Sequence, residues 1–231
     1  MCSTVVPAWY WALRFLPRTS GRTASSRQTL SGPLTPSLYL SRYNLPLDET
    51  WEAEQTARLS STERARLARI SRPQRRAQFM VAHCALRWGL TAAGLENATI
   101  EVDSKGRPLV HASVPVYASI AHSADFVAAM VAGDPIGVDL ESTRRERDLS
   151  ATAALLGLSG DVSGDAATVL RAWVTAEARL KAGPHASPQV WLSTWEACQL
   201  AVAGSLSPPL AGVFDGMAGI YNATTLQWEA V

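Results

Sequence analysis

Two carboxylates, Asp139 and Glu141, stand two residues apart in the segment 137–141 (Gly-Val-Asp-Leu-Glu), which ends an otherwise apolar run. The run is typical of a β-strand, and because strand side chains alternate between faces, both carboxylates share one face. Like charges at this spacing repel unless a cation or a shared proton relieves them. A hard divalent ion such as Mg²⁺, holding a phosphorylated substrate, is one solution. A strand end that turns polar where it meets solvent is the alternative, and the segment alone favours neither.

A second charged pair, Glu177 and Lys181, lies in residues 166–182, whose pattern predicts a helix ended by Gly183 and a proline. Trp173, Glu177 and Lys181 follow one another at intervals of four residues and therefore share one side of that helix. An amphipathic helix with an ordinary Glu–Lys pair, worth a few tenths of a kcal/mol, is the simpler interpretation. The apolar residues around Trp173 instead place both charged groups at the edge of a buried face. Lysine is also rare, since only Lys105 and Lys181 occur against nineteen arginines, which suits a need for a compact, protonatable amine.

The elements that must position these groups follow from periodicity and turn signals. Residues 50–69 and 74–92 predict two helices, the second with a strongly basic start whose default interpretation is a solvated face. The turn Gly133-Asp134-Pro135 predicts that strands 126–132 and 136–141 pair as a hairpin. That hairpin would bring His122 to the sheet end that carries Asp139 and Glu141. Further strands are expected at 38–40, 100–103, 116–120 and 199–203.

The composition limits the classes of protein to which this chain can belong. A chain of 231 residues, 47% hydrophobic and 18% charged, can bury a proper core as one larger domain or two small halves. The net charge of +1 argues against non-specific nucleic-acid binding, and no apolar run reaches membrane-helix length. Three scattered cysteines fit a reducing, cytoplasmic setting. Residues 1–36 hold four arginines and no acid, so we expect a disordered leader, a transit peptide or an unused upstream start.

Taken together, these segments resemble the Sfp-type phosphopantetheinyl transferases, which move the phosphopantetheine arm of coenzyme A onto a serine of a carrier protein. The resemblance spans residues 37–205 and rests on five motifs in order. They are an Arg-rich helix ending in Leu-Arg (75–87), Gly-Arg-Pro (106–108), Ser-Ile-Ala-His-Ser (119–123), Gly-Val-Asp-Leu-Glu (137–141) and Trp-x-x-x-Glu-Ala-x-x-Lys (173–181). It implies an α+β fold of two pseudo-repeated halves, 37–118 and 119–231, each a small, mostly antiparallel sheet packed on a long helix. Coenzyme A would bind between the halves.

The resemblance also implies roles for the residues. Asp139, Glu141 and Glu177 would hold Mg²⁺, with Mn²⁺ as a substitute, and three carboxylates suit such an ion. Glu177 would take the proton of the carrier serine, directly or through a water, and Lys181 would neutralise the departing 3′,5′-ADP. The residues expected to bind coenzyme A are Arg75, Arg76, Lys105, Arg107, His122 and Ser123.

Three departures from the family pattern keep a second interpretation open. Ala176 stands where the family has a lysine, Ala121 where it has a serine, and Arg107 where it has a lysine. The leading hypothesis is an active holo-[acyl-carrier-protein] synthase, a cytoplasmic monomer that serves fatty-acid, polyketide or peptide carriers, with no nucleic-acid or membrane partner. The alternatives are a weak or inactive homologue that binds carrier proteins or coenzyme A, and another Mg²⁺-dependent phosphoryl-transfer enzyme.

Overall fold

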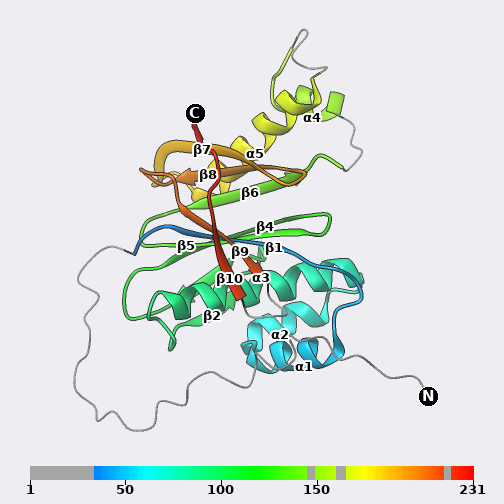
Figure 1. The fold of residues 1–231 in the computed structure, drawn as a ribbon, viewed down its shortest axis with the longest axis vertical. Coiled ribbons are helices and arrows are strands. Elements are labelled where there is room, and N and C mark those ends of the chain that lie inside the picture. Colours follow the sequence, from blue (N-terminus) through cyan, green and yellow to red (C-terminus); the bar gives the residue numbers. More distant parts are fainter. Residues whose placement is uncertain (1–33, 145–148, 160–164, 216–219) are drawn as a thin grey trace.

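Two β-sheets pack face to face, and a long helix covers the outer side of each, so that the molecule has four layers (Figure 1). This computed structural model describes residues 34–144, 149–159, 165–215 and 220–231. The fold is therefore α+β, as the sequence predicts. The predicted leader falls almost wholly outside the described residues. No helix in the described ranges is long and apolar enough to cross a membrane.

The first sheet has five strands in the order β10-β9-β1-β5-β4, and the second has four in the order β11-β7-β8-β6. The bounds in the first sheet are β1 (Ser37–Arg42), β4 (Tyr117–Ser123), β5 (Phe126–Ala132), β9 (Leu210–Asp215) and β10 (Ile220–Thr224). Those in the second are β6 (Gly137–Ser142), β7 (Ser187–Trp195), β8 (Cys198–Gly204) and β11 (Glu229–Ala230). A separate antiparallel pair joins β2 (Thr99–Val102) to β3 (Pro108–His111). The first sheet thus takes strands from both sides of residue 118, the expected boundary between halves.

The helices are α1 (Glu49–Arg58), α2 (Ser61–Ala68), α3 (Pro73–Ala92), α4 (Leu149–Leu155) and α5 (Ala166–Ala182). The predicted helices at 74–92 and 166–182 correspond to α3 and α5. Residues 50–69 do not form one helix, contrary to the prediction. The chain breaks at Ser60, whose hydroxyl accepts the Glu63 N–H while the Glu63 carboxylate accepts the Ser60 N–H. This reciprocal capping box starts a second helix.

The predicted hairpin between residues 126–132 and 136–141 is wrong. β5 pairs with β1 on one edge and β4 on the other, so it has no free edge for β6. β6 instead pairs with β8 in the second sheet. The turn after β5 therefore carries the chain from one sheet to the other.

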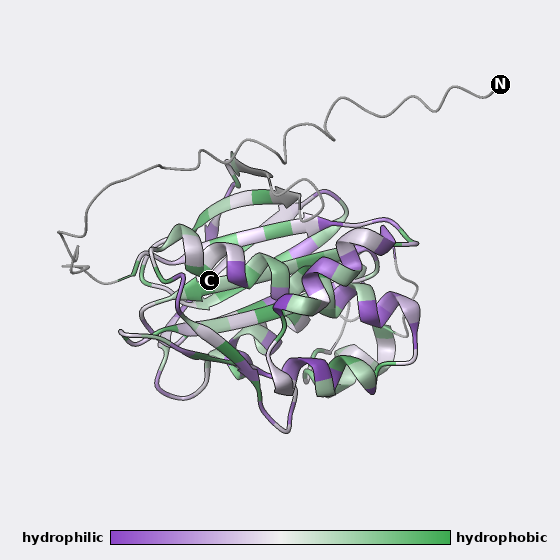
Figure 2. Ribbon diagram, turned by 90° about the horizontal axis from the view of Figure 1, so that it is seen from below, coloured by the Kyte–Doolittle hydropathy of each residue, from purple (hydrophilic) through white to green (hydrophobic). Residues whose placement is uncertain are grey.

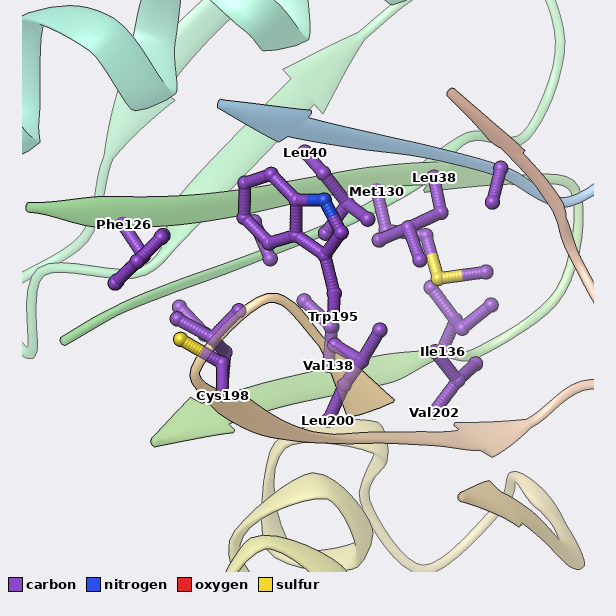
Figure 3. Packing of buried hydrophobic residues seen from close by; sticks show 14 of the residues in the cluster. Leu38, Leu40, Phe126, Met130, Ile136, Val138, Trp195, Cys198, Leu200 and Val202 are labelled. Carbon is purple, nitrogen blue, oxygen red and sulfur yellow. The ribbon is translucent and has the colours of Figure 1, made fainter. Parts of the chain in front are cut away.

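The central core lies between the sheets (Figure 3). Leu38 and Leu40 of β1 and Met130 of β5 meet Val138 of β6 there, and Trp195 lies between the layers, edge-on to the Phe126 ring. Every second residue of β6 therefore faces this core, while Gly137, Asp139 and Glu141 face the other way. In Figure 2 the strands are mainly white to green, and the strongest purple lies on helices and connections.

Helix α5 approaches β6 unusually closely. A Cβ at Gly137 would lie 2.0 Å from the Ala178 carbonyl oxygen and 2.5 Å from the Ala182 nitrogen. No side chain fits in that space, so glycine sets the distance between helix and strand. The helix side that carries Glu177 and Lys181 is thereby held against the strand that carries Asp139 and Glu141.

Candidate active site

The two sheets meet at β4 and β6, which are edge strands of different sheets. Side chains join these edges. The Val138 N–H donates to Ser119 Oγ and the Ser142 N–H donates to Ser123 Oγ, each at 3.0 Å. The constant offset between donor and acceptor shows that the two strands run in the same direction. We call this contact the β4–β6 seam.

Lys181 lies at the same seam. Its Nζ donates to Asp139 Oδ1 at 2.7 Å, to the Val138 carbonyl at 3.0 Å and to the Ile120 carbonyl at 3.3 Å. An ammonium group has three donors, and three protein oxygens match them here. One side chain from α5 therefore connects the edges of both sheets and pairs with the carboxylate predicted to bind metal.

Asp139 is buried, and it is only partly satisfied. Its Oδ2 is a buried atom with no hydrogen-bond partner among the described residues. Burial raises the pKa of Asp139 to about 6 against the opposing effect of Lys181, and the nearby charges of Glu141 and Glu177 add to the rise. Lys181 thus pairs with one oxygen of this carboxylate, and the other oxygen has no hydrogen-bond partner among the described residues.

A cavity of about 680 Å³ opens beside the seam, with Asp139 and Lys181 in its wall. The cationic residues that line the rest are Arg66, Arg69, Arg72, Arg75, Lys105 and Arg107, together with His122. Most of the expected coenzyme residues thus line one cavity. The expected hairpin is absent, yet His122 still reaches the carboxylate end because β4 itself lies along β6.

Arg75 and His122, which both line the cavity, contact each other. Nη1 of Arg75 lies 3.0 Å from Nδ1 and 3.1 Å from Nε2 of His122, and it donates to Gln78 Oε1 at 3.2 Å. Burial, followed by the charge of Arg75, lowers the pKa of His122 to about 4, so the ring is neutral near pH 7. Arg75 supplies the permanent charge here.

The turn after β4 fixes this arrangement. Ala124 has a φ of 52°, and its carbonyl accepts from Tyr43 Oη at 3.0 Å, Gln78 Nε2 at 2.8 Å and Gln74 Nε2 at 3.1 Å. Two of these donors belong to α3. The first turns of α3, which present Arg75, are thus tied to the end of β4.

A loop between β2 and β3 carries two more cations. Asp103 Oδ1 accepts the backbone N–H groups of Lys105 and Arg107, each at 2.8 Å, and Oδ2 accepts from Arg107 Nε at 3.0 Å. Hydrogen bonds from the Arg107 backbone and then its side chain lower the pKa of Asp103, with a further one from the Lys105 backbone. The Gly-Arg-Pro turn therefore has a structural anchor that directs it at the cavity.

Four expected site residues do not line the cavity. Arg76 points elsewhere, since it donates to Glu52 Oε1 at 3.0 Å and to the Leu67 carbonyl at 3.2 Å. Ser123 is buried, with its hydroxyl on Glu141 rather than on the cavity. Glu141 and Glu177 are half-buried and lie near Asp139 without lining the cavity wall.

Sequence reasoning missed Arg66, Arg69 and Arg72 as site residues. All three are exposed and lie three positions apart, from the last turn of α2 to the residue before α3. Within a helix, residues three apart share a face, so the spacing of Arg66 and Arg69 was an available signal. The basic start of the following helix was instead interpreted by default as a solvated face.

The negative charges of Asp139, Glu141 and Glu177 suit a metal ion, but the three carboxylates are not gathered into a ready metal site. Among the described residues, no three His, Cys, Asp or Glu side chains are clustered closely enough to form a metal-binding group. Lys181 occupies Asp139 Oδ1 and Ser123 occupies Glu141 Oε2. The unpartnered Asp139 Oδ2, which the charges of Glu141 and Glu177 make less favourable to ionise, is nevertheless the kind of oxygen that a divalent cation satisfies.

Comparison with known proteins identifies the first part of this site. Residues 63–132 match the family model of the 4′-phosphopantetheinyl transferase N-terminal domain. The matched range runs from α2 to β5 and includes the cationic wall of the cavity, while the carboxylates and Lys181 follow it in the chain. No curated protein is matched by the chain. The family match falls on the residues that build the cationic half of the cavity, and it supports the phosphopantetheinyl transferase superfamily for this chain.

Proposed function

We propose that this protein transfers 4′-phosphopantetheine from coenzyme A to a serine of an acyl or peptidyl carrier protein, in a Mg²⁺-dependent reaction that releases 3′,5′-ADP. The observation that carries the proposal is the cavity, whose wall combines seven arginine and lysine side chains with the incompletely paired carboxylate Asp139. A substrate with several phosphates and a bound cation complements both parts of that wall.

The cationic wall provides binding. Arginine offers a planar fork of donors that suits phosphate oxygens, and Arg75 is the arginine in contact with His122. In the proposed complex, Arg75, His122 and the loop residues Lys105 and Arg107 hold the phosphates of coenzyme A. A phosphate beside His122 would favour its protonated form and so add a second charge-assisted contact.

The carboxylates beside the cavity, together with Lys181, provide the chemistry. Asp139, Glu141 and Glu177 would hold Mg²⁺, which when bound supplies Lewis-acid polarisation of the phosphate. The carrier serine oxygen attacks the β-phosphorus, and the bond from that phosphorus to the oxygen of 3′,5′-ADP breaks. Glu177 takes the serine proton, directly or through a water. Lys181 holds Asp139 in place and contributes positive charge near the leaving group.

The layers support the interpretation of the fold as two related halves. One long helix packs on each sheet, α3 on the first and α5 on the second, although the first sheet takes most of its strands from beyond residue 118. In the proposed complex coenzyme A lies between these halves, with its phosphates on the α3 side. The carrier serine then approaches from the α5 side.

Intact-mass spectrometry of an apo-carrier protein tests the proposal. The carrier is incubated with this protein, coenzyme A and Mg²⁺, and it should gain the mass of one phosphopantetheine group. Chelating the metal should abolish the gain. No gain with fatty-acid, polyketide or peptide carriers would overturn the enzymatic function, and a gain that persists without divalent metal would overturn the roles given to the carboxylates.

The departure at Ala121 favours a second candidate function. This residue is buried and lines the cavity, so the hydroxyl that the family places there is absent from the binding surface. A protein that binds coenzyme A or a carrier without transferring the group would show this pattern. Calorimetry that detects coenzyme A binding, together with a mass assay that detects no transfer, would identify that function.

A further inference from the structure

We propose that Ser123 is a positioning residue that orients Glu141 for metal binding, an inference that rests on the proposed Mg²⁺-dependent function. The hydroxyl of Ser123 donates to Glu141 Oε2 at 2.6 Å. Ser123 is 2% exposed and does not line the cavity. Its position therefore points to a role behind the carboxylate and not to direct contact with coenzyme A.

The direction of this hydrogen bond follows from the backbone of β6. The Ser142 N–H donates to Ser123 Oγ at 3.0 Å, which uses a lone pair of the hydroxyl. A serine hydroxyl has one proton to donate, and that proton is directed at Glu141. The Ser123 hydroxyl is therefore fixed by the backbone of β6 and in turn fixes the position of the Glu141 carboxylate.

This arrangement answers a specific need of Glu141. A glutamate has three rotatable side-chain bonds and loses much rotamer freedom when it binds an ion. Glu141 is only half-buried, and Ser123 is one of the groups that hold its carboxylate. A buried hydroxyl anchored on the same strand restricts the carboxylate before the ion arrives, as partners behind metal ligands commonly do.

Ser119 provides a control within the same strand for the bond to the backbone of β6, although Ser119, unlike Ser123, lines the cavity. It lies four residues earlier on β4, is 5% exposed, and accepts the Val138 N–H at the same 3.0 Å. Both serines therefore make one equivalent bond across the β4–β6 seam. Ser123 alone of the two has a hydrogen bond to a predicted metal ligand.

The test measures the dissociation constant of Mn²⁺ by electron paramagnetic resonance, with the full chain, for the wild type, Ser123→Ala and Ser119→Ala. Mn²⁺ is used alone and with coenzyme A. We expect Ser123→Ala to bind Mn²⁺ about 10-fold more weakly. With Mn²⁺ alone, Ser119→Ala should stay within about 2-fold. In urea, Ser119→Ala loses its seam bond, and Ser123→Ala loses its seam bond together with the bond to Glu141, so the unfolding free energy should fall more in Ser123→Ala. Ser123→Thr, which keeps a hydroxyl, should recover most of the affinity.

The outcomes separate this inference from the proposed function. Equal Mn²⁺ affinity in Ser123→Ala and the wild type, or an equal loss in Ser119→Ala, would overturn the positioning role. A wild type that binds no Mn²⁺ would overturn both the role and the metal site. A wild type that binds Mn²⁺ with the expected dependence on Ser123 but modifies no carrier protein would overturn the transferase function while supporting the inference.

Discussion

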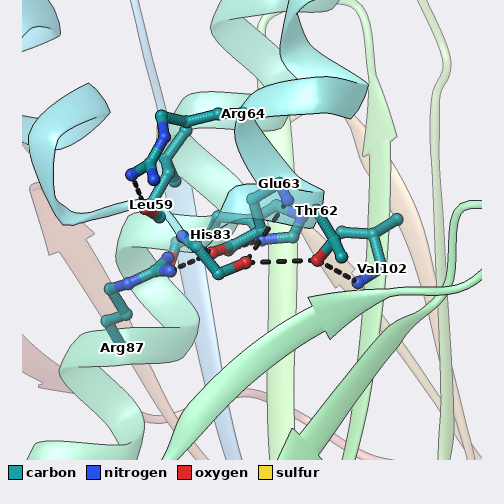
Figure 4. Close-up of polar contacts among 8 residues, drawn as sticks. Leu59, Thr62, Glu63, Arg64, His83, Arg87 and Val102 are labelled. Carbon is teal, nitrogen blue, oxygen red and sulfur yellow. Dashed lines mark hydrogen bonds and ion pairs between the residues drawn. The ribbon is translucent and has the colours of Figure 1, made fainter.

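Two buried carboxylates, Glu63 beside the first sheet and Asp139 in the second, occupy opposite kinds of environment. Glu63 is fully buried and accepts hydrogen bonds from His83 at 2.6 Å, from Arg87 and from the Ser60 N–H at 2.7 Å (Figure 4). Burial alone would raise its pKa, yet these partners lower the pKa of Glu63 to about 2. Asp139 has one partner for one oxygen and none described for the other, and its pKa is raised to about 6.

The difference distinguishes a structural carboxylate from a functional one. Burying a charge is costly unless hydrogen bonds and an opposite charge compensate it. Glu63 is fully compensated and holds α2 against α3. Asp139 keeps an uncompensated oxygen, and such strain at a cavity wall is typical of a group whose partner is a ligand.

Asp139→Asn should have the largest effect, and it should fall on activity. The variant keeps its size and can still accept from Lys181 Nζ, but it removes a charge from the proposed metal site. Transfer to the carrier should fall at least about 10³-fold, roughly 4 kcal/mol of transition-state stabilisation. The unfolding free energy in urea at pH 7 should change little, because the removal of a buried charge offsets the loss of the ion pair with Lys181. A transfer rate near that of the wild type would contradict the functional reading of Asp139.

Glu63→Gln should lower the stability of the fold and leave the transfer activity nearly unchanged, the opposite of Asp139→Asn. Arg87 would lose the charge that compensates it, and His83 would lose its carboxylate acceptor, so the unfolding free energy should fall by about 3 kcal/mol. Urea titration followed by circular dichroism measures this loss. Transfer activity at a temperature where the variant is folded should stay within a few-fold of the wild type. A variant as stable as the wild type but inactive would show that Glu63 serves the site and not the fold.

Stability should depend on pH with opposite signs for the two carboxylates. The pKa of Glu63 is lowered, so its contribution is present above about pH 4.5 and is lost as the pH falls toward 2. Burial also lowers the pKa of His83, which adds to the loss of stability below about pH 6.5. The pKa of Asp139 is raised from 3.8 to about 6, so its contribution declines as the pH rises through that window.

Unfolding free energies measured from pH 3 to pH 7 check these signs. The advantage of the wild type over Glu63→Gln should shrink as the pH falls below 4.5. The unfolding free energy of Asp139→Asn relative to that of the wild type should increase as the pH rises from 4 to 6. Parallel pH profiles for the two variants would show that the two environments do not differ in the way described.

The smallest effect is expected from two neighbouring arginines. Arg75→Ala should weaken coenzyme A binding about 10-fold, measured by calorimetry, because Arg75 lines the cavity. Arg76→Ala should leave that affinity within about 2-fold, since Arg76 pairs with Glu52. Equal losses of affinity in both variants would mean that the cationic wall acts through overall charge rather than through Arg75.

Local sequence patterns predicted helices α3 and α5, which carry site residues, and strand β6, which carries Asp139 and Glu141. Alternation and four-residue spacing are encoded within short segments, which is why those predictions are confirmed. The capping box at Ser60 and Glu63 was also local, and a Ser-x-x-Glu signal inside residues 50–69 could have revealed the helix break.

The remaining features depend on distant parts of the chain. The pairing of β1 with both β5 and β9 joins segments far apart in sequence, so no local signal could exclude the expected hairpin. For the same reason the sequence could not separate Arg75 from Arg76, or show that Ser123 faces Glu141. Each of those distinctions is made by a neighbouring element and not by the residue itself.

The missing side chain at Gly137 limits how this site can be altered. Adding one methyl group there would remove no charge and no hydrogen bond, but it would push α5 off the sheet, because the obstacle is helix backbone that cannot rotate aside. Glu177 and Lys181 would move together with the helix. Displacements near 1 Å can cost about 10²-fold in rate. The alignment of the charged groups is therefore a property of the spacing between two backbones, and redesign of the charged residues alone could not restore it.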